Sequence, residues 1–195
     1  MLIPIQPQAV DKFFNNNGIA ARFSQAEIRR LTDSQPGPRD GFVSYPTPSD
    51  SEQLSILGLR RCLGVEPGPP GCVFFDHPWY LDEPFGHEPC RAGWHTIAAS
   101  PLSDSFDKPI YYADTLAAAG LFLPTAVEVV LMLFLSLSIG EERLLLRKHT
   151  WTRTRTKGRR FVSVGAFGEK GLFVSSHEVG YQSRGLGICP VLGRD

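Results

Sequence analysis

Two stretches in the first half of the chain combine a helix start signal with apolar residues at helical spacing. Ser24 is followed at the third position by Glu27, and this capping box predicts a helix over residues 25–32. Asp50 gives a second start signal, and the apolar positions after it predict an amphipathic helix that ends at Gly64. Both helices should turn one apolar edge toward a core.

Two further helices are predicted in the most apolar part of the chain. Residues 110–119 should be helical up to Gly120, and a capping box of Thr125 and Glu128 then opens a helix over residues 126–139. The second helix has almost no polar face, so other structure must cover most of its sides. Polar residues and a proline interrupt the apolar run, which is therefore shorter than the roughly 20 residues that a membrane span needs.

The first half is otherwise rich in proline, glycine and aromatic residues. Residues 35–49 combine several helix and strand breakers with little periodicity, which predicts a loop or linker. Residues 65–106 fit short strands at 72–75 and 94–98 joined by long loops. The 19 glycines and 16 prolines of the chain agree with many turns and long connections.

After residue 140 the period of the pattern changes from helical to two. Threonines alternate over residues 150–156 with Trp151, Arg153 and Arg155, which predicts a strand with threonines on one face and these three side chains on the other. A Lys-Gly pair follows as a turn. Further strands are predicted at residues 160–166, 171–175 and 188–192.

These elements predict an α+β fold with a small twisted antiparallel sheet, two packed helices and long irregular loops. Residues 106–195 would hold the sheet and its helices, and residues 1–105 would form a helical and loop-rich part of the same compact domain. The first residues lack the basic region and the small-residue cleavage site of a signal peptide and carry two prolines. The protein is therefore expected in the cytoplasm as synthesised, with display outside the cell left open.

Three motifs follow one another in the second half: an LPT-x-x-E segment, a W-x-R-T strand and a terminal G-x-x-P-V-L segment. The residues that form these motifs and the helix before them are Tyr111, Tyr112, Ala113, Gly120, Leu123, Pro124, Thr125, Glu128, Trp151, Arg153, Thr154, Gly187, Ile188, Cys189, Pro190, Val191 and Leu192. With them, residues 106–195 resemble the bacterial and phage branch of the C-type lectin-like fold. That branch includes formylglycine-generating-enzyme-like domains and the variable proteins of diversity-generating retroelements.

The resemblance implies a non-catalytic module that binds a protein or another ligand, in one form a diversity-generating retroelement variable protein. The enzyme members of the branch hold copper with two cysteines four residues apart, and sugar-binding lectins hold calcium with a carboxylate-rich triplet. This chain has neither pattern. The resemblance therefore implies no cofactor, and it favours binding over catalysis.

Charge is segregated along a chain that is neutral as a whole. Residues 1–140 carry 9 basic and 15 acidic side chains, whereas residues 141–195 carry 11 basic and 5 acidic ones. The excess gathers in residues 143–160, the basic hairpin, where arginine beside an aromatic ring suits an anionic partner. In the resembled fold the loop before the terminal strand also faces the ligand. The binding surface is expected to comprise Trp151, Arg153, Arg155, Arg159, His177, Glu178, Tyr181, Gln182 and Arg184.

Two other functions stay open at this point. The basic hairpin could belong to a nucleic-acid-associated accessory protein. A metal-dependent enzyme of unknown reaction could hold zinc with Cys72, His77, His87 and Cys90, although their spacing follows no established zinc pattern. Free reduced thiols, or a disulfide of Cys72 with Cys90 or Cys62, are the other readings of the cysteines. No nucleophile elbow, P-loop or dinucleotide-binding glycine motif accompanies them.

Overall fold

The computed structural model describes residues 4–65 and 73–193 of the chain. In this part the α-helices are α1 (Pro7–Asn16), α2 (Gln25–Asp33), α3 (Ile56–Leu63) and α4 (Ala126–Gly140). The 3₁₀-helices are η1 (Pro78–Tyr80), η2 (Pro84–His87), η3 (Ser103–Ser105) and the longer η4 (Ile110–Ala119). The strands are β1 (Phe42–Thr47), β2 (Gly93–Ala98), β3 (Leu121–Phe122), β4 (His149–Arg155), β5 (Phe161–Gly168), β6 (Gly171–His177), β7 (Leu186–Gly187) and β8 (Val191–Leu192).

The strands of the described residues form two four-stranded sheets. The first has the order β1-β2-β8-β3 and antiparallel pairs. The second has the order β6-β5-β4-β7, and its β4–β7 pair is parallel. The α+β class is confirmed, but a single sheet within residues 106–195 is wrong, because β1 and β2 come from the first half of the chain. In place of the single strand expected at residues 188–192, the structure has the two short strands β7 and β8, which belong to different sheets.

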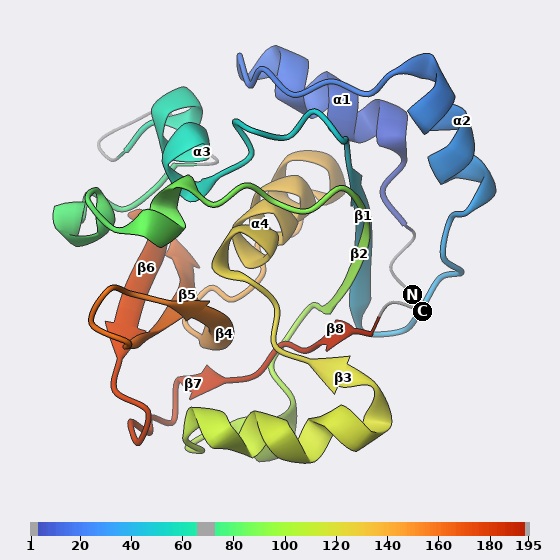
Figure 1. Cartoon of the computed structure of the whole chain (residues 1–195). Coiled ribbons are helices and arrows are strands. Elements are labelled where there is room, and N and C mark those ends of the chain that lie inside the picture. The colour runs from blue at the N-terminus through green and yellow to red at the C-terminus, as the bar shows by residue number, and fades with distance from the viewer. Residues whose placement is uncertain (1–3, 66–72, 194–195) are drawn as a thin grey trace.

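Helix α4 lies between the two sheets (Figure 1). Every side chain from Ala126 to Ser136 is buried, and the helix packs against α1, α3, β1, β2, β4 and β5. Thr125 and Glu128 form the predicted capping box at its start. Because a helix without a polar face needs cover on all sides, α4 forms the centre of the core.

One hydrophobic cluster takes in residues of both halves of the chain. Its members include Phe14 of α1, Tyr45 of β1 and Phe134 of α4. A smaller cluster holds η4 on the second sheet. The buried members of the smaller cluster are Ile110, Trp151, Leu186 and Ile188.

Two elements in the first half are not predicted by the sequence pattern. Helix α1 starts at Pro7 without a side-chain cap, and Val10, Phe13 and Phe14 form its buried edge. Strand β1 occupies residues expected to form a loop, and it contains Pro46. It lies at the edge of its sheet, where a proline is tolerated because the missing N–H does not interrupt a ladder on both sides.

Helix α3 begins at Ile56 and not after Asp50. The Ser55 hydroxyl oxygen accepts a hydrogen bond from the Gly58 N–H at 3.1 Å and so caps the helix. Asp50 forms an isolated bridge with Arg22 instead. The start signal at Asp50 therefore marks a turn that precedes the helix.

The strand predicted at residues 72–75 lies partly outside the described residues, since Cys72 is not among them. Phe74 forms isolated bridges with Val65 and Leu172 and belongs to no strand. Strand β2, helix α2 and the long helices of the second half occur within a few residues of their predicted positions. The period-two pattern likewise gives β4, β5 and β6.

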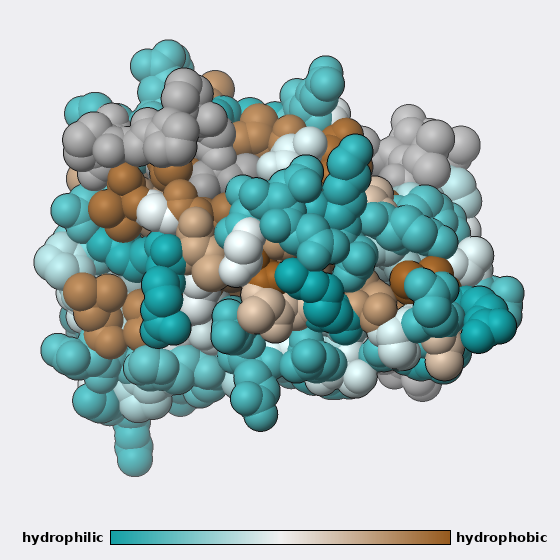
Figure 2. All heavy atoms as spheres, turned by 90° about the horizontal axis from the view of Figure 1, so that it is seen from above, coloured by the Kyte–Doolittle hydropathy of each residue, from teal (hydrophilic) through white to brown (hydrophobic). Residues whose placement is uncertain are grey.

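No helix in the described part of the chain has the length and apolar character to cross a membrane. Seen from above (Figure 2), hydrophobic side chains reach the face formed by α1, α2 and α3 in separate patches between hydrophilic ones. The apolar surface on that face is therefore divided.

Phe134→Ala tests the central position of α4. Phe134 is fully buried, and its ring meets those of Phe74 and Phe167 at centroid distances of 5.1 and 5.4 Å. We expect urea denaturation to show a loss of about 3–5 kcal/mol in the free energy of unfolding. Leu146→Ala is the control, since Leu146 is half exposed and its loss should stay near 0.5 kcal/mol, roughly the size of surface effects. Equal losses in the two variants would contradict the central position.

Candidate functional site

Strand β4 places arginine and threonine side chains on opposite faces. Arg153 and Arg155 are exposed, as the alternation predicts. Thr152 and Thr154 are buried on the other face. The Thr154 hydroxyl oxygen accepts a hydrogen bond from the Ala126 N–H at 2.9 Å, at the start of α4. The inward threonines therefore fix the strand against the core and leave the arginines facing out.

Trp151 shares a strand face with the arginines but is not exposed there, which corrects its place in the expected binding surface. The side chain is fully buried, and its indole N–H donates to the Lys108 carbonyl at 3.2 Å. Ile110 of η4 packs against it. Helix η4 therefore covers the part of the strand face that Trp151 occupies, and Arg153 emerges beyond that cover.

A hollow of about 540 Å³ opens beside η4, and we call it the arginine groove. The basic hairpin contributes its arginines, η4 contributes one wall, and the loop before the terminal strand contributes Val179. The hairpin and this loop, which the sequence analysis selects separately, thus meet at one site. The lining residues are Ile110, Tyr111, Ala113, Asp114, Leu123, Arg153, Arg155, Arg159, Phe161 and Val179.

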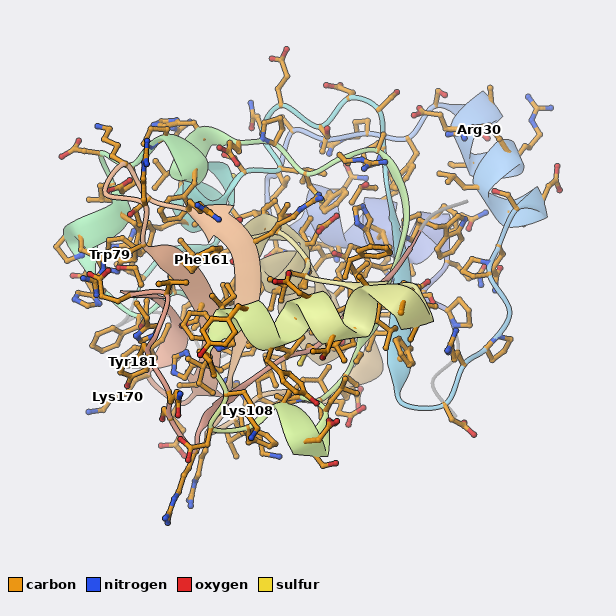
Figure 3. The ribbon with its side chains drawn as sticks, turned by 60° about the horizontal axis from the view of Figure 1, so that its bottom comes forward. Arg30, Trp79, Lys108, Phe161, Lys170 and Tyr181 are labelled. Atoms are coloured by element: carbon orange, nitrogen blue, oxygen red, sulfur yellow. The ribbon has the colours of Figure 1, made fainter. Side chains whose placement is uncertain are left out.

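The three arginines of the groove carry charge that the described residues do not pair. Arg155 lies over the Phe161 ring, with its Cζ atom 4.2 Å from the ring centre, and Phe161 lies beside η4 in Figure 3. Arg159 occupies a left-handed turn position with φ 61°. Within the described residues, none of the three forms an ion pair. Asp114 is the acidic residue of the lining, so positive charge prevails.

Several other basic residues of the hairpin are engaged with the protein itself. Arg143 donates to two carbonyls of β5. Lys157 donates to the Asp82 carbonyl at 2.8 Å, and Arg160 pairs with Glu178 at 2.5 Å. The basic hairpin is therefore not one continuous free face.

His177 and Tyr181, both predicted for the binding surface, stack on each other with ring centroids 4.3 Å apart. Burial and the charge of Arg160 lower the pKa of His177. The carboxylate of Glu178 is held by the same arginine. These side chains shape the loop that leads to the groove and do not line the groove itself.

The structure adds groove residues that the sequence does not single out. Tyr111 and Val179 are 60% and 53% exposed. In the sequence, Tyr111 stands out only as a position of the lectin-like motifs. Val179 is a single apolar residue in a polar loop, and such a residue does not predict a groove. Gln182 and Arg184, predicted from the same loop, are exposed but do not line the groove.

The zinc cluster that the sequence left open as an alternative does not form among the described residues. Cys72 lies outside them. His77 and His87 are exposed whereas Cys90 is buried, and no three metal-binding side chains of the described part gather as a site. Of the other cysteines, Cys62 is half-buried, and Cys90 and Cys189 are buried. The alternative of a disulfide from Cys72 to Cys90 or Cys62 lies outside the described residues, because Cys72 does.

A buried cluster of a thiol, an imidazole and a carboxylate lies between α4 and the first sheet. The Cys90 Sγ atom is 3.7 Å from His95 Nε2, and His95 Nδ1 is 3.1 Å from Glu128 Oε1. The Tyr45 ring stacks on the imidazole at 5.0 Å, and its hydroxyl donates to the Glu128 carbonyl at 2.6 Å. The order of the three groups is that of a nucleophile, a base and an orienting acid.

Both ring nitrogens of His95 face hydrogen-bond acceptors. Nε2 lies 2.9 Å from the Arg91 carbonyl, and Nδ1 faces the Glu128 carboxylate. A carboxylate can only accept, so Nδ1 carries a proton and donates to Glu128, while Nε2 also lies 3.0 Å from the Thr47 hydroxyl oxygen, which can donate or accept. Burial raises the pKa of Glu128, but the hydrogen bond and charge of His95, with the bonds from Thr125, lower it by more, to about 2.

This geometry suits a structural pair better than nucleophilic catalysis. A general base must turn a lone pair toward the thiol, whereas the Arg91 carbonyl and the Thr47 hydroxyl oxygen lie nearer to His95 Nε2 than the Cys90 sulfur does. Cys90 is only 2% exposed, which leaves a substrate no open route to the sulfur. The pair instead ties α4 to β2, and breaking it would leave one buried charge without compensation.

No family model, curated protein or solved structure matches this chain. The resemblance to the C-type lectin-like fold therefore depends on the motifs of residues 106–195 alone. A fold by itself does not assign a function, so a functional proposal must be argued from the arginine groove.

Glu128→Gln and Glu27→Gln compare two capping-box glutamates, of which only Glu128 also contacts a buried histidine. Both glutamates occupy the third helical position, where glutamine also serves. We expect Glu128→Gln to lower the free energy of unfolding at neutral pH by about 3 kcal/mol, because it breaks the buried pair with His95. The control Glu27→Gln should cost less than about 1 kcal/mol, since its partners are at the surface.

The pH dependence of this difference has a defined sign. The folded pKa of Glu128, about 2, lies below its ordinary value of 4.5. The carboxylate therefore stabilises the fold above pH 4.5, and its contribution disappears as the pH falls toward 2. In urea denaturation across this range, the gap between wild type and Glu128→Gln should close at the acid end. A gap that is independent of pH would contradict an ionised Glu128.

Alkylation with iodoacetamide compares the reactivity of the thiols. Cys62 is half-buried, whereas Cys90 and Cys189 are buried, and burial raises the pKa of Cys189 to about 12. We expect peptide mass spectrometry to find Cys62 modified first, and the other two only as the protein unfolds. Faster modification of Cys90 than of Cys62 in the native protein would restore Cys90 as a candidate nucleophile.

Proposed function

We propose that this protein is a non-catalytic binding module that recognises an anionic ligand in the arginine groove. The observation that carries the proposal is the convergence of Arg153, Arg155 and Arg159 on one hollow without ion pairs to other described residues. A guanidinium binds a carboxylate or a phosphate through two parallel hydrogen bonds. The stack of Arg155 on Phe161 holds one of these groups in place before a ligand arrives.

The apolar part of the lining favours a ligand with more than a bare charge. Leu123, Phe161 and Val179 stand beside the arginines. The volume of about 540 Å³ falls within the range of ordinary ligand sites, roughly 300–1,000 Å³. An anion attached to an apolar or aromatic body fits both features.

We further propose that residues 106–195 adopt the C-type lectin-like fold. The LPT-x-x-E segment opens α4, the W-x-R-T segment lies in β4, and the terminal motif contributes to β7 and β8. This order of elements supports the proposal. So does the position of Val179, because the loop before the terminal strand is the ligand-facing loop of that fold.

A diversity-generating retroelement variable protein is the finer form of this proposal. Five lining residues of the groove fall within residues 150–185, where such a protein would vary. The gene neighbourhood tests it: a reverse transcriptase gene and a near-copy of the last hundred or so bases should lie beside this gene. Their absence would overturn the variable-protein form and leave a binding module of fixed sequence.

Tripolyphosphate probes the anion site because it carries closely spaced charges and no ring. We expect isothermal titration calorimetry to show binding that Arg155→Ala and Arg159→Ala each weaken about tenfold. Arg30→Ala is the control, since Arg30 is exposed on α2 and lies away from η4 in Figure 3. Equal affinities in all variants, or no binding to the wild type, would contradict the arginine groove as the site.

A further inference from the structure

A second hollow, of about 250 Å³, adjoins the arginine groove. Both hollows are lined by Leu123 and Arg153, so Arg153 stands at their junction. Arg91, from the loop before β2, is the other basic residue of the second hollow, and β3 and β8 provide its apolar walls. A ligand that fills the arginine groove and extends past Arg153 would therefore meet Arg91.

Each hollow has an exposed aromatic ring beside its arginines. Tyr111 lines the arginine groove and is 60% exposed, and Phe122 lines the second hollow and is 46% exposed. Phe122 lies against Gly193, where a Cβ atom would come within 2.7 Å of the ring. The glycine thus lets this ring lie close against the chain. Exposed rings next to arginines offer flat faces on which nucleic-acid bases stack.

The carboxylate of Glu128 borders the second hollow without cancelling its positive charge. Its side chain is only 6% exposed. Oε1 faces Nδ1 of His95, and Oε2 accepts a hydrogen bond from the Thr125 N–H at 2.6 Å. Because this charge is compensated inside the protein, Arg91 and Arg153 determine the sign of the hollow.

We propose that the two hollows form one continuous site for single-stranded nucleic acid. The inference rests on the proposed function, since it names the ligand class of the same groove. Phosphate groups bond the arginines, and neighbouring bases stack on Tyr111 and Phe122. Every basic side chain in the two linings is an arginine, and a guanidinium both pairs with phosphate and stacks on bases.

Two other polyanions use these features less fully. An acidic peptide pairs with the arginines but brings no regular flat groups for the exposed rings. A duplex keeps its bases stacked inside and offers mainly phosphate to a protein surface, which again leaves Tyr111 and Phe122 without partners. A single strand supplies charge and flat faces together.

Fluorescence anisotropy with labelled octathymidine tests the second hollow. We expect Arg91→Ala and Phe122→Ala each to weaken binding about tenfold, as loss of a phosphate or stacking contact does. Arg91→Ala should also reduce the slope of log Kd against log salt concentration by about 0.7. Phe122→Trp, which keeps a ring, should retain the affinity, and so should the control Arg30→Ala.

Tripolyphosphate separates the two hollows, because it needs only the arginine groove. Arg91→Ala and Phe122→Ala should bind it within about twofold of the wild type, whereas Arg155→Ala should lose affinity for both probes. Arg91 and Phe122 are exposed, so the substitutions should leave the fold intact, and far-UV circular dichroism verifies this.

The outcomes distinguish this inference from the proposed function. If octathymidine binds Arg91→Ala and Phe122→Ala as it binds the wild type, the two-hollow site is overturned and the arginine groove stands. If an octaglutamate peptide or a short duplex binds more tightly than octathymidine, single-stranded nucleic acid is the wrong class. If tripolyphosphate does not bind the wild type, the proposed function itself fails.

Discussion

Helix α4 is stable only if apolar side chains surround it, and most of the fold follows from that requirement. The side chains buried from Ala126 to Ser136 leave almost none of its surface for water, and one sheet can cover only one side of a helix. Two sheets, α1 and α3 therefore share the cover. This is why the first half of the chain, which looks loop-rich in sequence, supplies two strands and three helices to the same core.

Contacts at the N-terminus of α4 fix the positions of β2 in the core and of β4 at the surface. Glu128 pairs with His95 and fixes the helix on β2. Thr154 takes up the first helical N–H, and the backbone N–H of Arg153 donates to the Pro124 carbonyl at 2.9 Å. The start of the helix thereby sets the position of β4, so its arginines face out where the cover of η4 ends. The geometry of the arginine groove is thus a consequence of the core as much as of the loops around it.

Local signals in the sequence predict local structure well, but they do not predict contacts between distant segments. The capping box at Thr125 marks the start of α4, and the alternation of threonine and arginine gives the faces of β4. Alternation cannot say what covers a face, so Trp151 is misplaced until η4 is seen above it. Pro46 misleads in a similar way, because a proline is acceptable in a strand only at a sheet edge, which the whole topology determines. The pairing of His95 with Glu128 joins separate elements, and a single sequence carries no signal for such a pair.

The basic excess in the last part of the chain does not form one basic surface in the folded protein. In the sequence, an acidic first part and a basic last part suggest either a basic face for a partner or an internal match between the two. The structure divides the basic side chains between these roles. Lys157 reaches the Asp82 carbonyl and Arg160 pairs with Glu178, whereas the three arginines of the groove form no ion pair within the described residues. A charge that is paired inside the protein contributes little to recognition. The groups that a ligand reads therefore occupy a much smaller area than the basic hairpin, and the positions around Arg153 decide the specificity of that area more than the net charge does.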